Sequence, residues 1–156
     1  MKKFPDKKKI IIFSGKLNKS KGYHVFGKSI VKILEKNSDW KALVIGNEPR
    51  EKHYFKHKNL KILNWLEHNK LLKFFEKSSI SVVNPTWQEP FGRTAMESAS
   101  RGCAVITSVS GGLQETFDNN LILKKNNSNY LIKKIQFLID NSKKLIFYQK
   151  QNFNNV

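Results

Sequence analysis

Short apolar runs alternate with helical patterns along the chain. The runs are rich in Ile, Val and Leu and end at Gly or at polar turn residues, which is typical of strands buried on both faces of a parallel sheet. They cover residues 9–14, 41–45, 60–63, 80–83 and 103–107, with a shorter run at 121–123. Six strands are therefore expected, the last of them short.

The segments between these runs have the spacing of amphipathic helices. In residues 21–35, apolar side chains recur every three or four positions. Similar patterns predict a compact helix ending near Phe75, a helix at 91–101 that is stopped by Gly102, and one or two helices from Tyr130 to about Gln149.

The alternation of strands and helices predicts an α/β fold with a doubly wound parallel sheet, in a single Rossmann-like unit. The length of 156 residues fits one domain. We expect residues 1–156 to form it, with a core at about 9–139 and a helical tail at 140–156. In such sheets, ligands bind outside the carboxyl ends of the strands.

Composition narrows the class of protein. Hydrophobic residues make up 39% of the chain, enough for a packed core. No apolar stretch approaches the roughly 20 residues that span a bilayer, and residues 1–9 lack the apolar region of a signal peptide, so a cytoplasmic location is expected.

A single cysteine, Cys103, excludes an internal disulfide and a thiolate metal site, and its place in an apolar run predicts a core residue. The four histidines have no metal-ligand spacing, so no metal site is expected: His24, His53, His57 and His68.

The net charge of +17 comes from 29 Lys and Arg against 12 Asp and Glu. Only Arg50, Arg93 and Arg101 are arginines, whereas nucleic-acid readers favour Arg, so no specific nucleic-acid partner is expected. From Lys124 onward there are seven Lys and one acid, Asp140. This segment either forms a solvated helical face or attracts an anionic surface such as a membrane without specificity.

The loop after the first strand carries two cations between two glycines. It runs from Gly15 to Gly22 and contains Lys16 and Lys21. It is neither a G-x-G-x-x-G fingerprint nor a Walker A loop. A strand that delivers lysines to a helix N-terminus nevertheless suits a phosphate group. The alternative is a pair of solvated loop lysines.

A second candidate site follows the strand at 80–83. Pro90 disfavours helical geometry at Glu89, so this carboxylate is expected in the loop, while Glu97 falls within the next helix. Between the two acids, free backbone N–H groups at a helix N-terminus would form an anion cradle, from Phe91, Gly92, Arg93 and Thr94. The alternative makes Glu89 a partner of the helix dipole and Glu97 a surface carboxylate.

Three motifs together resemble the C-terminal, donor-binding domain of retaining GT-B glycosyltransferases, in glycosyltransferase family four, the glycosyl transferases group one. They are the Gly-Lys-x4-Lys-Gly loop at 15–22, the Glu-Pro-Phe-Gly segment with Glu89 and Glu97 eight positions apart, and the Ser-Gly-Gly-Leu-Gln-Glu segment at 110–115. The resemblance runs in order from about residue 9 to 123.

The resemblance implies roles for the first loop. Lys16, at a position where Arg is commoner, and Lys21 would bind the diphosphate of a sugar nucleotide and act in catalysis, between Gly15 and Gly22. Retaining transfer in this family uses no metal and no side-chain nucleophile, so no cofactor is implied.

The second motif would bind the sugar and the ribose. By resemblance, Glu89 is a catalytic residue that holds sugar hydroxyls, the segment from Phe91 through Thr94 meets sugar and phosphate, and Glu97 takes the ribose hydroxyls. The base would lie near residues 64–66, where Trp65 is either a stacking platform or an interface or core aromatic.

The resemblance implies transfer of a hexose from a nucleoside-diphosphate sugar to a glycan or lipid acceptor in envelope polysaccharide or lipopolysaccharide synthesis, at the inner membrane face. Family enzymes also have an N-terminal acceptor half. The chain is accordingly expected to be a fragment, a half that pairs with a separate partner chain, or a domain without catalysis. The alternative function is a non-catalytic module that binds nucleotide sugars. A basic nucleic-acid binder ranks last, because aromatic residues do not interleave with an Arg patch.

Overall fold

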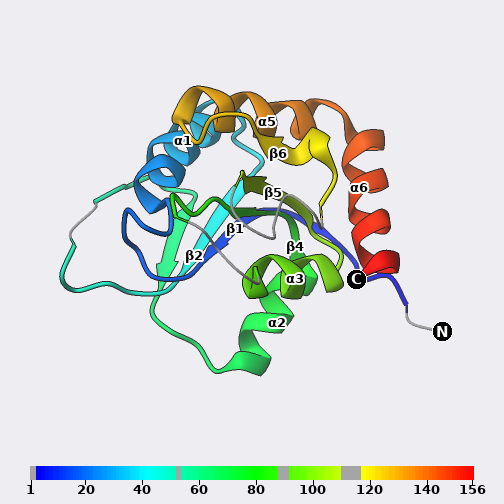
Figure 1. Cartoon of the computed structure of the whole chain (residues 1–156), viewed down its shortest axis with the longest axis horizontal. Coiled ribbons are helices and arrows are strands. Elements are labelled where there is room, and N and C mark those ends of the chain that lie inside the picture. The colour runs from blue at the N-terminus through cyan, green and yellow to red at the C-terminus, as the bar shows by residue number, and fades with distance from the viewer. Residues whose placement is uncertain (1–2, 52–53, 88–91, 110–116) are drawn as a thin grey trace.

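The computed structural model describes residues 3–51, 54–87, 92–109 and 117–156. In these residues six strands form one parallel sheet, in the order β3-β2-β1-β4-β5-β6 (Figure 1). Their bounds are β1 Lys8–Ser14, β2 Lys41–Ile45, β3 Leu60–Leu63, β4 Ser78–Val83, β5 Ala104–Ser108 and β6 Ile122–Leu123. The doubly wound α/β fold predicted from the sequence is confirmed.

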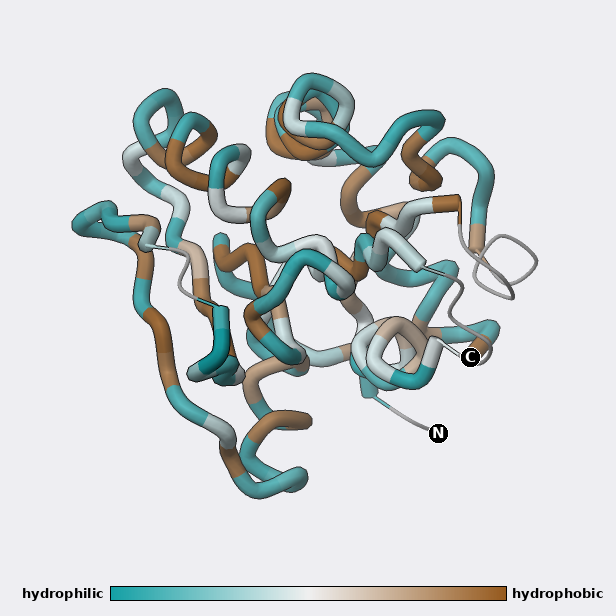
Figure 2. Tube along the Cα trace, turned by 60° about the vertical axis from the view of Figure 1, so that its left-hand side comes forward, coloured by the Kyte–Doolittle hydropathy of each residue, from teal (hydrophilic) through white to brown (hydrophobic). Residues whose placement is uncertain are grey.

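Helices cover both faces of the sheet. One face packs on α1 (Tyr23–Lys36) and α5 (Ser128–Asp140), and the other packs on α2 (His68–Lys77) and α3 (Arg93–Ser100). A 3-10 turn, η1 (Asn119–Leu121), precedes β6. Hydrophobic positions gather on the strands and within the helices, and most connecting segments are hydrophilic (Figure 2). Because both faces are covered, the central strands read as continuous apolar runs.

The last helix, α6 (Ser142–Asn155), packs where β4 and β5 begin. Its Gln149 amide donates to the Ser79 carbonyl at 3.1 Å, and its Asn152 amide donates to the Cys103 carbonyl at 2.8 Å. Both amides are buried. The segment expected as a helical tail therefore fills the amino end of the sheet.

Strand β4 begins two residues earlier than the apolar pattern predicts. Ser78 and Ser79 are buried although they are polar. Their hydroxyls donate to the carbonyls of Phe74 and Lys8, so neither hydroxyl is left unsatisfied. Polar residues thus extend the strand because they bond to neighbouring backbone.

Cys103 is fully buried in the core, as expected, and it lies just before β5 rather than within the strand. Its thiol contacts the Phe75 carbonyl at 3.2 Å and the Ser78 carbonyl at 3.3 Å. Burial raises the pKa of this thiol to about 11, so the group stays protonated at neutral pH.

Candidate functional site

A cavity of about 270 Å³ lies at the carboxyl ends of β1 and β4. These strands are adjacent at the point where the strand order reverses, which is where doubly wound sheets bind ligands. Among the described residues, its walls come from both strand ends, the β1–α1 loop and the start of α3: Phe13, Ser14, Gly15, Lys21, Val82, Val83, Pro85, Gly92, Arg93 and Thr94. The fold thus brings together Lys21, Gly15 and the described part of the anion cradle.

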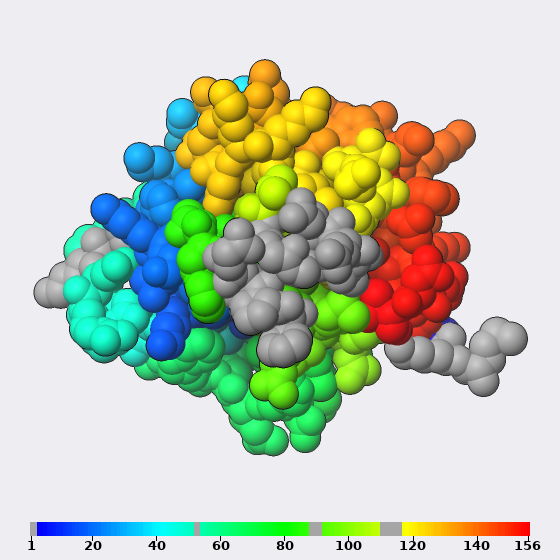
Figure 3. Space-filling model, in the orientation of Figure 1, coloured from blue at the N-terminus to red at the C-terminus, as the bar shows by residue number. Residues whose placement is uncertain are grey.

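The β1–α1 loop is held in place by hydrogen bonds to the segment after β4. The Thr86 N–H donates to the Ser20 carbonyl at 2.9 Å, and the Thr86 hydroxyl donates to the Lys19 carbonyl at 2.9 Å. Within the loop, the Asn18 side chain accepts from the Lys21 N–H at 2.9 Å. The two segments lie in contact on the molecular surface (Figure 3). Lys21 is therefore carried on a loop with a fixed shape.

Gly22 closes this loop against Asn84, which follows β4. Gly22 has φ +80°, and a Cβ atom there would overlap the Asn84 carbonyl oxygen. The buried Asn84 amide also donates to the Gly22 carbonyl at 3.2 Å. Only glycine accommodates both the left-handed backbone and the close approach. Gly22 therefore determines the shape of the loop through its backbone conformation and its contact with Asn84.

The side chain of Lys21 lines the cavity. Its ammonium nitrogen is 5.4 Å from the centre of the Trp87 ring, and Trp87 is 49% exposed. This cation–π contact attracts the ammonium electrostatically and orients it. The site therefore combines a cation and an exposed aromatic ring at one edge.

The opposite wall is the N-terminus of α3. Gly92 is the N-cap, with φ +58°, and its lack of a side chain leaves the helix end without a side-chain cap. The first N–H groups of a helix have no partner within the helix, and the dipole makes this end positive. Arg93 and Thr94 line the cavity from this end. An anionic group between Lys21 and α3 would meet positive charge on two sides.

Lys16 lines a second hollow beside the first. This hollow, also of about 270 Å³, is formed with the loop after β2 and with Trp65, which is 54% exposed. The described wall of the first cavity includes Lys21 and does not include Lys16. The two lysines of the loop thus line neighbouring hollows. The exposed Trp65 side chain does not belong to the core.

Among the remaining predicted site residues, Glu97 lies in the described part of the chain and the others do not. Glu97 is on α3, and its carboxylate lies 3.9 Å from a ring nitrogen of His68, the first residue of α2. Its side chain is 25% exposed. Glu89, Phe91 and the Ser-Gly-Gly motif at 110–115 lie outside the described residues.

The Glu48–Arg50 pair was not singled out by the sequence patterns. The Glu48 side chain is only 5% exposed and accepts two hydrogen bonds from the Arg50 guanidinium, at 2.9 Å and 3.2 Å. These hydrogen bonds lower the pKa of Glu48 from 4.5 to about 2. The Asn18 amide lies 3.5 Å from the same carboxylate, so the pair borders the β1–α1 loop. Its position just after β2, at the carboxyl edge, is the signal that could have identified it.

The described residues contain neither a metal-binding cluster nor a membrane-spanning helix. Within 3–51, 54–87, 92–109 and 117–156, no three His, Cys, Asp or Glu side chains gather as a group that could hold a metal ion. None of the helices in this part of the chain has the length and apolar character that a bilayer crossing requires.

Comparison with known proteins identifies the family. The family model of glycosyl transferases group 1 matches residues 2–152. Spore coat protein SA of Bacillus subtilis is 27% identical over 71% of this chain and 33% of its own length. An uncharacterized glycosyltransferase of Methanocaldococcus jannaschii, MJ1607, is 25% identical over 97% of this chain and 43% of its own. The chain thus spans less than half the length of these relatives.

Solved structures share the fold. The C-terminal domain of the group 1 glycosyl transferase LpcC from Francisella tularensis matches with a TM-score of 0.84 and 24% identity, over 94% of this chain and 83% of that domain. Anabaena HepE, solved in complex with UDP-glucose, matches with a TM-score of 0.81 and 15% identity, over 94% of this chain and 43% of HepE. The sheet is therefore that of the C-terminal half of GT-B enzymes, and the chain belongs to the glycosyl transferases group 1 family.

Proposed function

We propose that this chain is the donor-binding domain of a retaining glycosyltransferase, and that it binds the pyrophosphate of a nucleoside-diphosphate sugar in the cavity between β1 and β4. The observation that carries the proposal is the pairing of Lys21 with the N-terminus of α3 across one cavity at the switch point of the sheet. The complex of HepE, a protein of the same fold, with UDP-glucose supports this class of ligand.

The proposed chemistry is electrostatic. As the bond between sugar and phosphate breaks, negative charge grows on the leaving nucleoside diphosphate. Lys21 and the N–H groups at the start of α3 would stabilise that charge, with Lys16 contributing from the adjoining hollow. These groups would take the place of a metal ion. Charge stabilisation by fixed groups of this kind is a large term in enzymatic rate enhancement.

The other predicted residues keep their proposed roles. Glu89 would accept hydrogen bonds from sugar hydroxyls, and the backbone from Phe91 to Thr94 would meet sugar and phosphate. Glu97 would bind the ribose hydroxyls, and its closeness to His68 would orient the carboxylate. The base would lie in the hollow next to Trp65, where an exposed ring offers a stacking surface.

The proposed reaction moves a hexose to a glycan or lipid acceptor in envelope polysaccharide or lipopolysaccharide synthesis, at the cytoplasmic face of the inner membrane. Transfer would need an acceptor-binding half, supplied by the same protein or by a separate chain. A module that binds sugar nucleotides without catalysis has the same ligand. Turnover after mixing with a candidate acceptor half separates the two functions.

Calorimetry with UDP, GDP, ADP and their sugars tests donor binding. We expect Lys21→Ala to weaken binding of the preferred nucleotide by about tenfold or more, since charge-assisted hydrogen bonds contribute about 1.5–3 kcal/mol. Lys16→Ala should have a smaller effect, and Glu97→Ala should reduce the preference for ribose-bearing ligands over inorganic pyrophosphate. Lys28→Ala, an exposed lysine on α1, is the matched control. Equal affinities for the Lys21 and Lys28 variants would contradict the proposed site.

A further inference from the structure

Helix α6 has a second face that no other described element covers. One side of the helix packs inward through Leu145, Tyr148 and the two buried amides described above. The opposite side carries four residues spaced i, i+3, i+4 and i+7, which lie on one helical face: Lys143, Ile146, Phe147 and Lys150. We call these four residues the α6 face. Ile146 is 47% exposed and Phe147 is 55% exposed, so about half of each of these large apolar residues is open to solvent, between two lysines.

A basic groove of about 950 Å³ adjoins the α6 face. It runs between the N-terminal segment, the ends of α2 and α3, and α6. Its described charged residues are six cations and two carboxylates: Lys3, Lys7, Lys8, Lys77, Arg101 and Lys150, with Asp6 and Glu76. Apolar side chains of Phe4, Ile146 and Phe153 line it as well. The groove therefore adds positive charge and apolar surface beside the exposed face of the helix.

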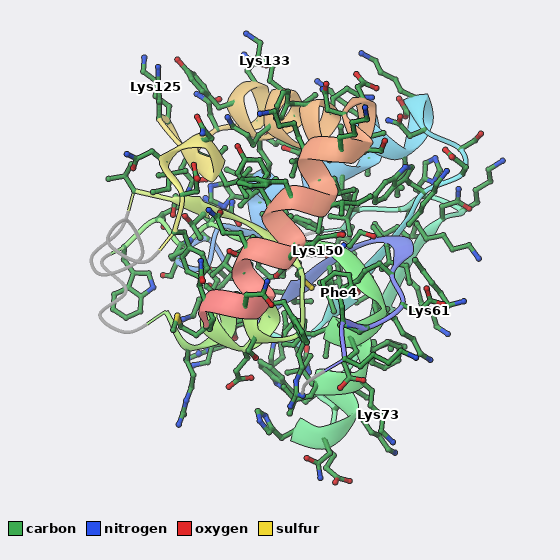
Figure 4. The ribbon with its side chains drawn as sticks, turned by 90° about the vertical axis from the view of Figure 1, so that its right-hand side faces the viewer. Phe4, Lys61, Lys73, Lys125, Lys133 and Lys150 are labelled. Carbon is green, nitrogen blue, oxygen red and sulfur yellow. The ribbon has the colours of Figure 1, made fainter. Side chains whose placement is uncertain are left out.

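Phe4 joins the groove to the α6 face. Its ring packs edge-on against Phe153, with ring centres 5.3 Å apart, and the Lys150 ammonium lies 5.9 Å from the Phe4 ring centre. Figure 4 shows α6 facing the viewer, with Lys150 and Phe4 next to each other. The N-terminal segment and α6 thus form one continuous surface, on which the Lys150 ammonium lies over an aromatic ring.

Charge and pattern favour one occupant for this surface. Helices that lie in the headgroup layer of a membrane carry apolar side chains with lysines one turn away. The apolar side chains enter the layer, and the lysine side chains extend to the lipid phosphates. A second copy of the chain would place lysine against lysine on a molecule of net charge +17. A nucleic acid would satisfy the lysines but would leave Ile146 and Phe147 in water.

We propose that the α6 face and the adjoining groove dock the protein on an anionic lipid bilayer. The surface lies near Lys8, where β1 begins, whereas the nucleotide cavity lies near Ser14, where β1 ends. Docking would therefore leave the nucleotide cavity accessible. The proposal does not depend on nucleotide binding, because it uses a different set of residues at the opposite edge of the sheet.

Co-sedimentation of the full chain with vesicles tests this proposal. We expect binding to vesicles of phosphatidylcholine mixed with phosphatidylglycerol, and little binding to pure phosphatidylcholine. Lys143→Glu/Lys150→Glu should reduce binding at least tenfold, because each lysine near an anionic surface contributes the equivalent of about a fivefold change. The matched control is Lys28→Glu/Lys32→Glu, which reverses two exposed lysines on α1. The control variant should lose much less vesicle binding than Lys143→Glu/Lys150→Glu.

A second pair of variants tests the apolar part. Ile146→Ser/Phe147→Ser removes the exposed apolar pair without changing charge, and it should weaken vesicle binding. Tyr130→Ser/Phe137→Ser, on the exposed side of α5, is its control. Equal loss in the α1 and α6 charge variants would show that net charge alone attracts the vesicles and would overturn the proposal. So would a wild-type dimer that Ile146→Ser/Phe147→Ser dissociates in the absence of lipid. Calorimetry with UDP on the same variants should give wild-type affinity, which separates this test from that of donor binding.

Discussion

Glu48 is a nearly buried carboxylate whose charge is stabilised by Arg50. Its pKa is about 2 in the folded chain, against an ordinary value of 4.5. A carboxylate with a lowered folded-state pKa contributes stability above its ordinary pKa, and this contribution is lost as pH falls toward the folded-state pKa. We therefore predict that the urea midpoint of the wild type falls between about pH 5 and pH 2 more steeply than that of Glu48→Gln. Urea unfolding across this pH range measures both slopes.

Glu35→Gln is the control for this prediction, because Glu35 is an exposed carboxylate on α1. It should keep the wild-type dependence on pH. If Glu48→Gln and the wild type lose stability in parallel, the ion pair does not stabilise the fold and the loop after β2 is held by other contacts.

The β1–α1 loop, which carries Lys16 and Lys21, has a position that the sequence predicts and a shape that it does not. The spacing of Lys16 and Lys21 between two glycines predicted a phosphate-binding loop, and the structure places this loop at the switch point. Which hollow each side chain enters depends on turns that Asn18 and Thr86 set through side-chain hydrogen bonds. The partners of Thr86 lie more than sixty positions away in the chain. No local pattern contains that information.

At the scale of elements, apolar periodicity located the strands and helices well because each buries an apolar face. Residues 41–45 and 60–63 are strands with the predicted bounds. The observed bounds differ from the predicted bounds where polar groups determine the end of a helix or strand. The predicted helical region from Tyr130 to Gln149 is two helices, and α5 begins at Ser128 because the Asn127 side chain accepts from the Tyr130 N–H at 3.0 Å. Such caps act through single hydrogen bonds, which periodicity does not register.

Helix α6 also provides a stability test at this scale. Asn152 is 8% exposed, and its amide donates to the Cys103 carbonyl. Asn152→Leu keeps a similar volume but leaves that carbonyl buried without its partner, which should cost about 1–3 kcal/mol of unfolding free energy. Gln151→Leu, at the preceding position on the helix, should change the unfolding free energy by less than about 0.5 kcal/mol. Chemical denaturation measures both, and equal stabilities would mean that α6 is not part of the cooperative unit.

At the scale of the whole molecule, the two edges of the sheet differ in what they offer a ligand. The carboxyl edge has a small cavity with a helix N-terminus and Lys21. The amino edge has a larger groove with lysines on it and an uncovered apolar pair beside it. A net charge of +17 acts on every anion that approaches. Specific binding must therefore be separated from attraction by the total charge.

The dependence of affinity on salt concentration distinguishes specific binding from attraction by the total charge. A nucleoside diphosphate that engages one or two lysines and the fixed N–H groups of α3 replaces few counterions, whereas duplex DNA held by many lysines replaces many. We predict that raising NaCl from about 50 to about 200 mM lowers UDP affinity by roughly tenfold at most, and lowers any DNA affinity by about a thousandfold or more. Calorimetry with UDP and fluorescence anisotropy with a labelled duplex give the two slopes.

Lys21→Ala should reduce UDP affinity at every salt concentration and leave DNA affinity nearly unchanged, because it removes a contact in the cavity but only one of 29 cations. If UDP and DNA affinities fell with salt in parallel, attraction by the total charge would account for nucleotide binding and the cavity would lose its proposed role.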